Sequence, residues 1–143
     1  MKHYKTKAYI LLQAAACILL LGLLLTGCGL GLHKTTKLRD LEFTVVSPEL
    51  LPAELVQLIE ERKTEAFKIT YSDKEYLYLC VGYGRQETGG YSIAVDELYL
   101  SDESIHLDTS LLGPGPEEQK GDSPSYPFIV IKLEYMDETV EFD

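Results

Sequence analysis

An apolar run near the start of the chain ends at a cysteine, and it limits how much of the chain is left to fold. Residues 8–25 are apolar apart from Gln13, follow three lysines, and close with Leu25-Thr26-Gly27-Cys28. A basic start, an apolar stretch and small residues are the order of a secretory signal peptide, and a cysteine directly after them is where bacterial lipoproteins are lipidated and cut. We therefore expect residues 1–27 to be a lipoprotein signal peptide and Cys28 to carry the lipid.

An uncleaved transmembrane anchor is the alternative interpretation, because the apolar run of 18 residues is near the lower limit for spanning a bilayer. The tetrapeptide that ends at Cys28 favours the lipoprotein, since a plain anchor has no need of it. With either anchor, we expect the rest of the chain to be extracytoplasmic and attached to the cell membrane.

Cleavage would leave 116 residues, the size of one ordinary domain with a single core. We divide them into a tether over residues 28–40 and a single globular domain over residues 41–143. Ten basic residues against 23 acidic ones remain, a net charge of −13, which argues against nucleic acid as a partner. In the tether, Lys34, Lys37 and Arg39 fit either a contact with anionic lipid headgroups or a solvated linker.

The cysteines allow no disulfide within the mature chain. Cys17 leaves with the signal peptide and Cys28 is used by the lipid, so Cys80 remains alone. Cys80 stands in the apolar run Tyr76-Leu77-Tyr78-Leu79-Cys80-Val81 without a nearby cationic group, so we expect a buried thiol with a raised pKa. A reactive nucleophile is the alternative.

The spacing of the apolar residues predicts a small α+β fold. Leu51, Leu55, Leu58 and Ile59 recur at helical spacing, which predicts one helix over about 52–63. Residues 75–83 are apolar or aromatic on both faces, which predicts a central strand. Further strands are predicted over 41–45, 67–71, 91–100, 105–111 and 128–133, and residues 139–142 could add a short last one. We expect the helix to pack on one mainly antiparallel sheet of about five or six strands.

Two strands carry more specific predictions. The apolar face shifts at Asp96-Glu97 within residues 91–100, and a β-bulge there would restore the register. In residues 105–111 the alternation places Ile105 and Leu107 inward, and it places His106, Asp108 and Ser110 outward, in solvent.

The sequence offers no convincing set of catalytic residues, so we do not expect an enzyme. The mature chain has only His33 and His106, too few histidines for a three-histidine metal site, and we expect no metal and no cofactor. His106 could serve Ser110 or Asp108 in a triad, but side chains two residues apart on a strand do not converge on a substrate. The segment from Gly82 to Glu87 begins like a dinucleotide fingerprint but lacks its third glycine and its helix.

Two loops remain as candidate binding sites. Residues 84–90 join two apolar strands, and Gly89-Gly90 would allow the positive φ angles of a tight hairpin end. Gly113-Pro114-Gly115-Pro116 opens a second loop, and Tyr126-Pro127-Phe128 closes it, with a cis bond before Pro127 as one option. Glycines and prolines that only shape turns are the alternative interpretation.

In this order the loop sequences resemble the PrcB C-terminal domain family. The resemblance rests on Tyr83-Gly84, Thr88-Gly89-Gly90-Tyr91-Ser92, Gly113-Pro114-Gly115-Pro116 and Tyr126-Pro127-Phe128, and it covers roughly residues 74–134. It implies a small bacterial lipoprotein, in a family named for a subunit that associates with a surface protease and stabilises it. Glu87, where the family often has proline, and the acidic Glu117, Glu118 and Asp122 depart from the pattern.

A second, weaker resemblance is to the chagasin-type cysteine protease inhibitors, whose loops plug an active-site cleft. The order of the loops is similar, but the chain lacks that family's Asn-Pro start and its Arg-Pro-Trp-like loop. This resemblance implies inhibition of a protease by the same loops.

We therefore expect a lipid-anchored, non-catalytic interaction module that binds an exported or surface protein, by resemblance a protease. Loops on a rigid sheet are the natural place for such contacts. The expected site residues, besides the lipidated Cys28, are Arg85, Gln86, Glu87, Thr88, Gly89, Gly90, Tyr91, Tyr126, Pro127 and Phe128. Glycines would set the loop shape, and aromatic rings would supply contact area.

Overall fold

The computed structural model describes residues 35–116 and 121–143. The signal peptide, the lipidation of Cys28, the first part of the tether, and Glu117 and Glu118 lie outside these residues. Within them, no helix is both long enough and apolar enough to cross a membrane.

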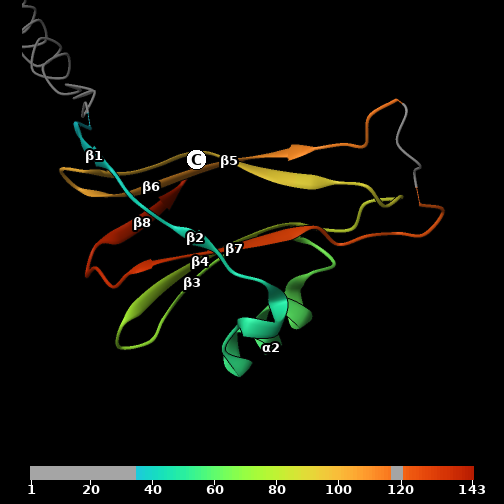
Figure 1. Ribbon diagram of the computed structural model, residues 1–143, viewed down its shortest axis with the longest axis horizontal. Helices are drawn as coiled ribbons and strands as arrows, with labels where there is room; N and C mark the ends of the chain where they lie inside the picture. The colour runs from blue at the N-terminus through green and yellow to red at the C-terminus, as the bar shows by residue number, and fades with distance from the viewer. Residues whose placement is uncertain (1–34, 117–120) are drawn as a thin grey trace, which may run out of the picture. The chain divides into compact units, whose positions relative to one another are not determined.

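The described residues form an α+β domain with two four-stranded sheets, one α-helix and one 3₁₀ turn (Figure 1). One sheet has the order β1-β5-β6-β8 and the other β2-β7-β4-β3, and every pairing is antiparallel except β6 with β8. The prediction of a single sheet is wrong. The bounds are β1 Lys37–Asp40, β2 Thr44–Val45, η1 Pro48–Leu50, α2 Ala53–Arg62, β3 Ala66–Ser72, β4 Tyr76–Tyr83, β5 Ser92–Ser101, β6 Ser104–Leu112, β7 Phe128–Glu134 and β8 Thr139–Phe142.

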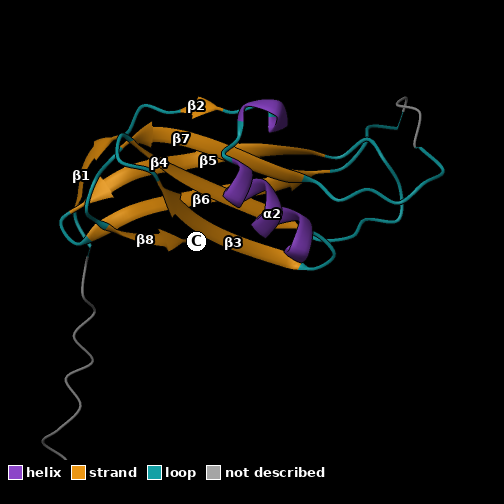
Figure 2. Ribbon diagram, turned by 90° about the horizontal axis from the view of Figure 1, so that it is seen from below, coloured by secondary structure: helices purple, strands orange, loops and turns teal. Residues whose placement is uncertain are grey.

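β4 is buried on both faces because it lies inside the middle layer of three, as predicted for a central strand. Leu77, Leu79 and Val81 point into a core shared with β5 and β6 of the other sheet. Tyr78 and Cys80 point the opposite way, into a second core beneath α2. Figure 2 shows the helix covering the outer face of the β2-β7-β4-β3 sheet. The alternation of side chains along one strand therefore supplies two cores.

The helix forms where its apolar spacing predicts it. Leu55 and Ile59, four residues apart, are its fully buried side chains, and both pack on β3, β4 and β7. Pro52 precedes the first turn, where its missing N–H costs nothing. Arg62 lies in the last turn, where a cation is favourable near the helix C-terminus.

Of the strand predicted over 41–45, only Thr44–Val45 is a strand, and another short strand precedes it in the other sheet. Lys37–Asp40, expected in the tether, is β1 and pairs with β5, whereas Thr44–Val45 is β2 and pairs with β7. Between them the buried Leu41 donates its N–H to Leu98 O (3.1 Å). The chain crosses from one sheet to the other here, and the first strand begins before residue 41.

The predicted bulge in residues 91–100 is confirmed. The β5–β6 register shifts between Val95 and Glu97. The extra residue keeps Val95, Leu98 and Leu100 against the same core between the sheets.

Asp73 closes the hairpin between β3 and β4. Its Oδ1 accepts the N–H groups of Glu75 (2.9 Å) and Tyr76 (2.7 Å), and its Oδ2 accepts the hydroxyl of Tyr78 (3.2 Å). These bonds, the two from the backbone first, stabilise the charged carboxylate and lower the pKa of Asp73. The turn predicted at Ser72-Asp73 is therefore stabilised by hydrogen bonds of the Asp73 side chain.

Candidate functional site

The loop over residues 84–91 connects two different sheets. β4 ends at Tyr83 in one sheet and β5 begins at Ser92 in the other, so the prediction of a hairpin end is wrong. Positive φ angles occur at Gly84 (70°) and Gly90 (86°), and not at Gly89. The chain thus turns at the start and at the end of the loop, where it leaves one sheet and enters the other.

This loop is joined to the segment that precedes β7. Gln86 and Ser125 exchange both backbone hydrogen bonds (2.8 and 3.0 Å), as an isolated antiparallel bridge. Ser125 Oγ donates to Thr88 O (2.6 Å), and Gly89 donates its N–H to Gly121 O (3.4 Å). Both segments lie at the same end of the two sheets (Figures 1 and 2). The structure therefore brings the two predicted loops together as one surface, which we call the paired-loop surface and define as residues 84–91 and 121–127.

The three residues predicted at the tip of this loop, 85–87, differ in their exposure to solvent and in their contacts with the rest of the domain. Arg85 and Glu87 are exposed and form an ion pair with each other. Gln86 is half-buried, and its Nε2 donates to Tyr83 O (3.0 Å). Gln86 thus holds the loop in place, whereas Arg85 and Glu87 face solvent.

The aromatic residues of the predicted site divide in the same way. Phe128 packs against the core beneath α2, so it supports the fold. Tyr126 is half-buried, with Lys63 Nζ 5.7 Å from its ring centroid. Pro127 O accepts the N–H of Tyr83 (3.0 Å), and its peptide bond is trans, as are all peptide bonds of the described segments. Tyr91 is half-buried and lies beside Gly113.

Cys80 is buried in β4, which confirms the structural interpretation of this thiol. Burial raises its pKa from the ordinary value of 9.0 to about 12. At neutral pH the group is therefore a protonated thiol without access to solvent, and it is a poor nucleophile.

The prediction that His106 lies in solvent is wrong. The residue is 5 % exposed, not solvated, and its ring stacks on that of Tyr99, with centroids 4.7 Å apart and planes 6° from parallel. Its Nε2 lies 3.0 Å from Ser104 Oγ, and its Nδ1 lies 3.2 Å from Asp143 Oδ2. Tyr99 is the direct cross-strand partner of His106. This pairing could have predicted that His106 is covered, but finding it requires the strand register, which the bulge in β5 shifts.

Hydrogen bonds link Ser104, His106 and Asp143 in the order of a serine protease triad, but a substrate cannot reach the serine hydroxyl. Ser104 is 1 % exposed, and its hydroxyl also donates to Glu141 Oε1 (3.1 Å). A nucleophile must reach the substrate carbonyl, and this oxygen is covered. The cluster instead attaches β8 to β6. Among residues 35–116 and 121–143, no group of three or more His, Cys, Asp or Glu side chains is placed to hold a metal ion.

Two four-stranded sheets with one covering helix, and a paired-loop surface at one end, define a small β-rich module that presents loops. The model of the family described as PrcB C-terminal matches residues 77–134, which run from β4 to the end of β7 and include both loops. This segment of the chain therefore matches the PrcB C-terminal family. No curated protein and no solved structure matches it.

Proposed function

We propose that this chain is a lipid-anchored, extracytoplasmic lipoprotein whose domain binds an exported or surface protein without catalysing a reaction. The family resemblance suggests a protease as the partner, which the domain would stabilise. Cys28 would hold the chain on the membrane, and the paired-loop surface would make the contact.

The observation that carries the proposal is the joining of the two loops. The bridge between Gln86 and Ser125 and the bond from Ser125 Oγ to Thr88 O link the loop after β4 to the segment before β7. Loops held in one conformation lose less conformational entropy on binding, which favours a specific contact. The same segment of the chain is the one that the family model matches.

The chemistry of the described residues supports a non-catalytic role. The thiol of Cys80 is buried and protonated, and the hydroxyl of Ser104 is covered. Arg85 and Glu87 are the exposed charged groups of the loop after β4, and they pair with each other. Such groups suit recognition of a polar partner surface.

Crosslinking in intact cells, followed by recovery of the lipidated full-length chain, would test the proposal. We expect a protease among the recovered proteins. The variant Arg85→Glu/Glu87→Arg keeps the ion pair but reverses its direction, so it should keep the melting temperature and lose most of the recovery. The matched control is Lys74→Glu/Glu75→Lys, which exchanges two exposed charges in the hairpin at the far end of β4. Equal recovery with both variants would contradict a role for the paired-loop surface.

Inhibition of the partner is the second candidate, because the chagasin-type resemblance uses the same loops. Purified chain added to the recovered protease separates the two functions. A longer lifetime of the active protease would support stabilisation, and loss of its activity in proportion to the added chain would support inhibition.

A further inference from the structure

β3 is the longest strand at an edge of either sheet. The sheets end on β1, β8, β2 and β3, which have four, four, two and seven residues. Short edge strands offer little to another chain, whereas a long one presents a row of backbone donors and acceptors. The edge of β3 is therefore the place where a further strand could be added.

The hydrogen bonds of β4 show which groups of β3 face outward. Tyr83 donates its N–H to Pro127 O, so the odd-numbered residues of β4 bond to β7 and the even-numbered ones bond to β3. The bond from Asp73 N–H to Tyr76 O agrees with this register. The backbone groups that point away from β4 are those of Ala66, Lys68, Thr70 and Ser72, and all four residues are exposed.

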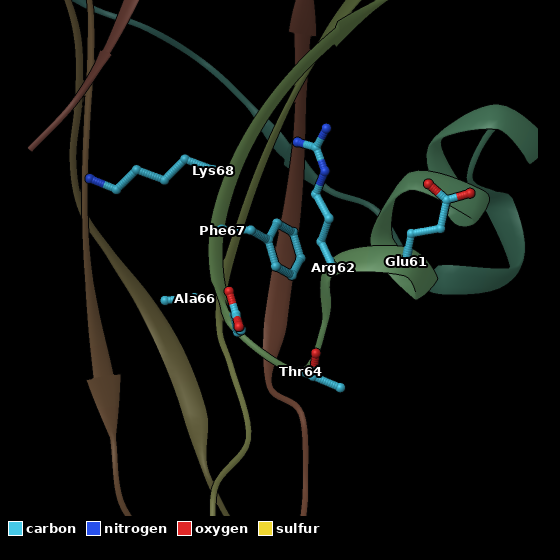
Figure 3. A pocket seen from close by; sticks show the side chains of 7 residues that line it. Glu61, Arg62, Thr64, Ala66, Phe67 and Lys68 are labelled. Carbon is cyan, nitrogen blue, oxygen red and sulfur yellow. The ribbon is translucent and has the colours of Figure 1, made fainter.

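Two depressions flank this edge, one on each face of the sheet. The first, of about 530 Å³, lies toward the end of α2 and is lined in part by Glu61, Arg62 and Glu65 (Figure 3). The second, also about 530 Å³, lies toward the other sheet and is lined in part by Val81, Tyr83 and Thr109. Both include Ala66, Phe67 and Lys68 of β3.

The one charged side chain of β3 does not protect the edge. A lysine on an edge strand usually keeps other strands away. Here Lys68 Nζ donates to Phe142 O (2.9 Å) and to Asp143 O (3.3 Å), so it is bent toward β8. In Figure 3, Lys68 and Ala66 extend from the side of β3 opposite to the ring of Phe67.

We propose that an extended segment of the partner polypeptide binds along β3 as an additional strand. Successive side chains of a strand point to opposite faces, so one would enter the charged depression beside Arg62 and the next the more apolar one beside Val81. The segment would alternate polar and apolar residues. This inference rests on the proposed function, in which a protein is the partner, but it uses a surface distinct from the paired loops.

The test uses a library of displayed peptides selected on the full-length chain, with the selected peptide then measured in solution. Thr70→Pro removes an outward N–H without removing a bond to β4, and it should weaken binding by about tenfold or more. Thr70→Ala is the matched control and should bind like the wild type. Ala66→Arg, which fills the depression beside Val81 and leaves the backbone intact, should also weaken binding if Thr70→Pro folds poorly. On binding, hydrogen exchange should slow at Lys68 and Thr70.

Other results would overturn the inference. If no peptide of alternating polarity binds, or if binding is insensitive to Thr70→Pro and Ala66→Arg, β3 is not the site. Loss of binding in Arg85→Glu/Glu87→Arg alone would leave the proposed function standing and move the contact to the loops. If the wild type is a dimer in size-exclusion chromatography and Thr70→Pro is a monomer, the strand that adds to β3 belongs to a second copy of this chain.

Discussion

The ring of Phe67 in β3 lies over the backbone of Gly82 in β4, its direct cross-strand partner. A Cβ atom at residue 82 would stand 2.5 Å from Phe67 Cζ and 2.6 Å from Phe67 Cδ1. Such distances do not occur without displacement of the ring, which belongs to the core beneath α2. The glycine therefore makes room for the aromatic residue.

Gly82→Ala should destabilise the domain by about 2 kcal/mol, the usual cost of forcing extra volume into a packed core. Chemical denaturation measures the loss. Gly113→Ala is the control, because its nearest neighbour would be 3.6 Å away, and its effect should stay within about 0.5 kcal/mol. Phe67→Leu in the Gly82→Ala background should cost less than in the wild type. Purely additive losses would contradict the contact.

Gly90→Ala should cost about 1 to 2 kcal/mol, because φ is +86° and an alanine there is strained. The added Cβ would also lie 3.0 Å from Pro114 Cβ. Gly89→Ala, one residue earlier and without a positive φ, should have little effect. Thermal unfolding of the two variants makes the comparison, and equal melting temperatures would show that residue 90 does not need glycine.

Cys80 should react slowly with a thiol reagent in the native domain and rapidly after unfolding. Because folding raises the pKa of Cys80 from 9.0 to about 12, the thiol of the folded state keeps its proton up to a higher pH than the thiol of the unfolded state. The corresponding stability is full below about pH 9 and is lost as the pH rises toward 12.

Cys80→Ala should cost about 1 to 2 kcal/mol at neutral pH through a small cavity. The Cys80→Ala variant should also lose less stability than the wild type as the pH rises above 9. Part of the loss should remain, because burial also raises the pKa of Tyr78. Rapid labelling of the native protein would contradict burial.

Ser104→Ala should cost about 1 to 3 kcal/mol, since it removes a buried hydroxyl that bonds to His106 and Glu141. Ser110→Ala on the same strand removes only an exposed hydrogen bond from a half-buried serine to Asp96, and it should change stability by less than about 0.5 kcal/mol. Because the cluster is covered and attaches β8 to β6, recovery of the partner should survive at temperatures where Ser104→Ala is folded. Loss of binding without loss of stability would point to a direct role.

Cys28→Ala should prevent lipidation and normal processing of the precursor. The uncut apolar run could still hold the precursor on the membrane, so fractionation alone does not decide. Mass spectrometry of the wild-type protein decides, because we expect a chain that begins at Cys28 and carries a diacylglyceryl group. A single acyl chain binds membranes only weakly, so stable attachment requires more than one. An unmodified Cys28 would contradict the anchor.

Local spacing in the sequence predicted the elements that depend on local order. The helix over 52–63 follows from apolar residues three and four apart, and the structure has it at Ala53–Arg62. The bulge follows from a shift of the apolar face within residues 91–100, and it lies between Val95 and Glu97. The burial of Cys80 follows from a strand that is apolar on both faces. The loop sequences also predicted the family, which the match over residues 77–134 confirms.

The tertiary structure decided which strands are neighbours, because periodicity shows the face of a strand but not its partner. Alternation could not show that residues 84–91 cross between sheets, that residues 37–40 form a strand, or that an eighth strand pairs parallel to β6. The alternation of residues 105–111 predicted that His106 lies in solvent, because the residue points out of the inter-sheet core. In the structure, Tyr99 from β5 and Asp143 at the end of β8 cover that outer face. The contacts that bury His106 and join Gln86 to Ser125 link residues far apart in the sequence, and such pairings exist only when the whole chain has folded.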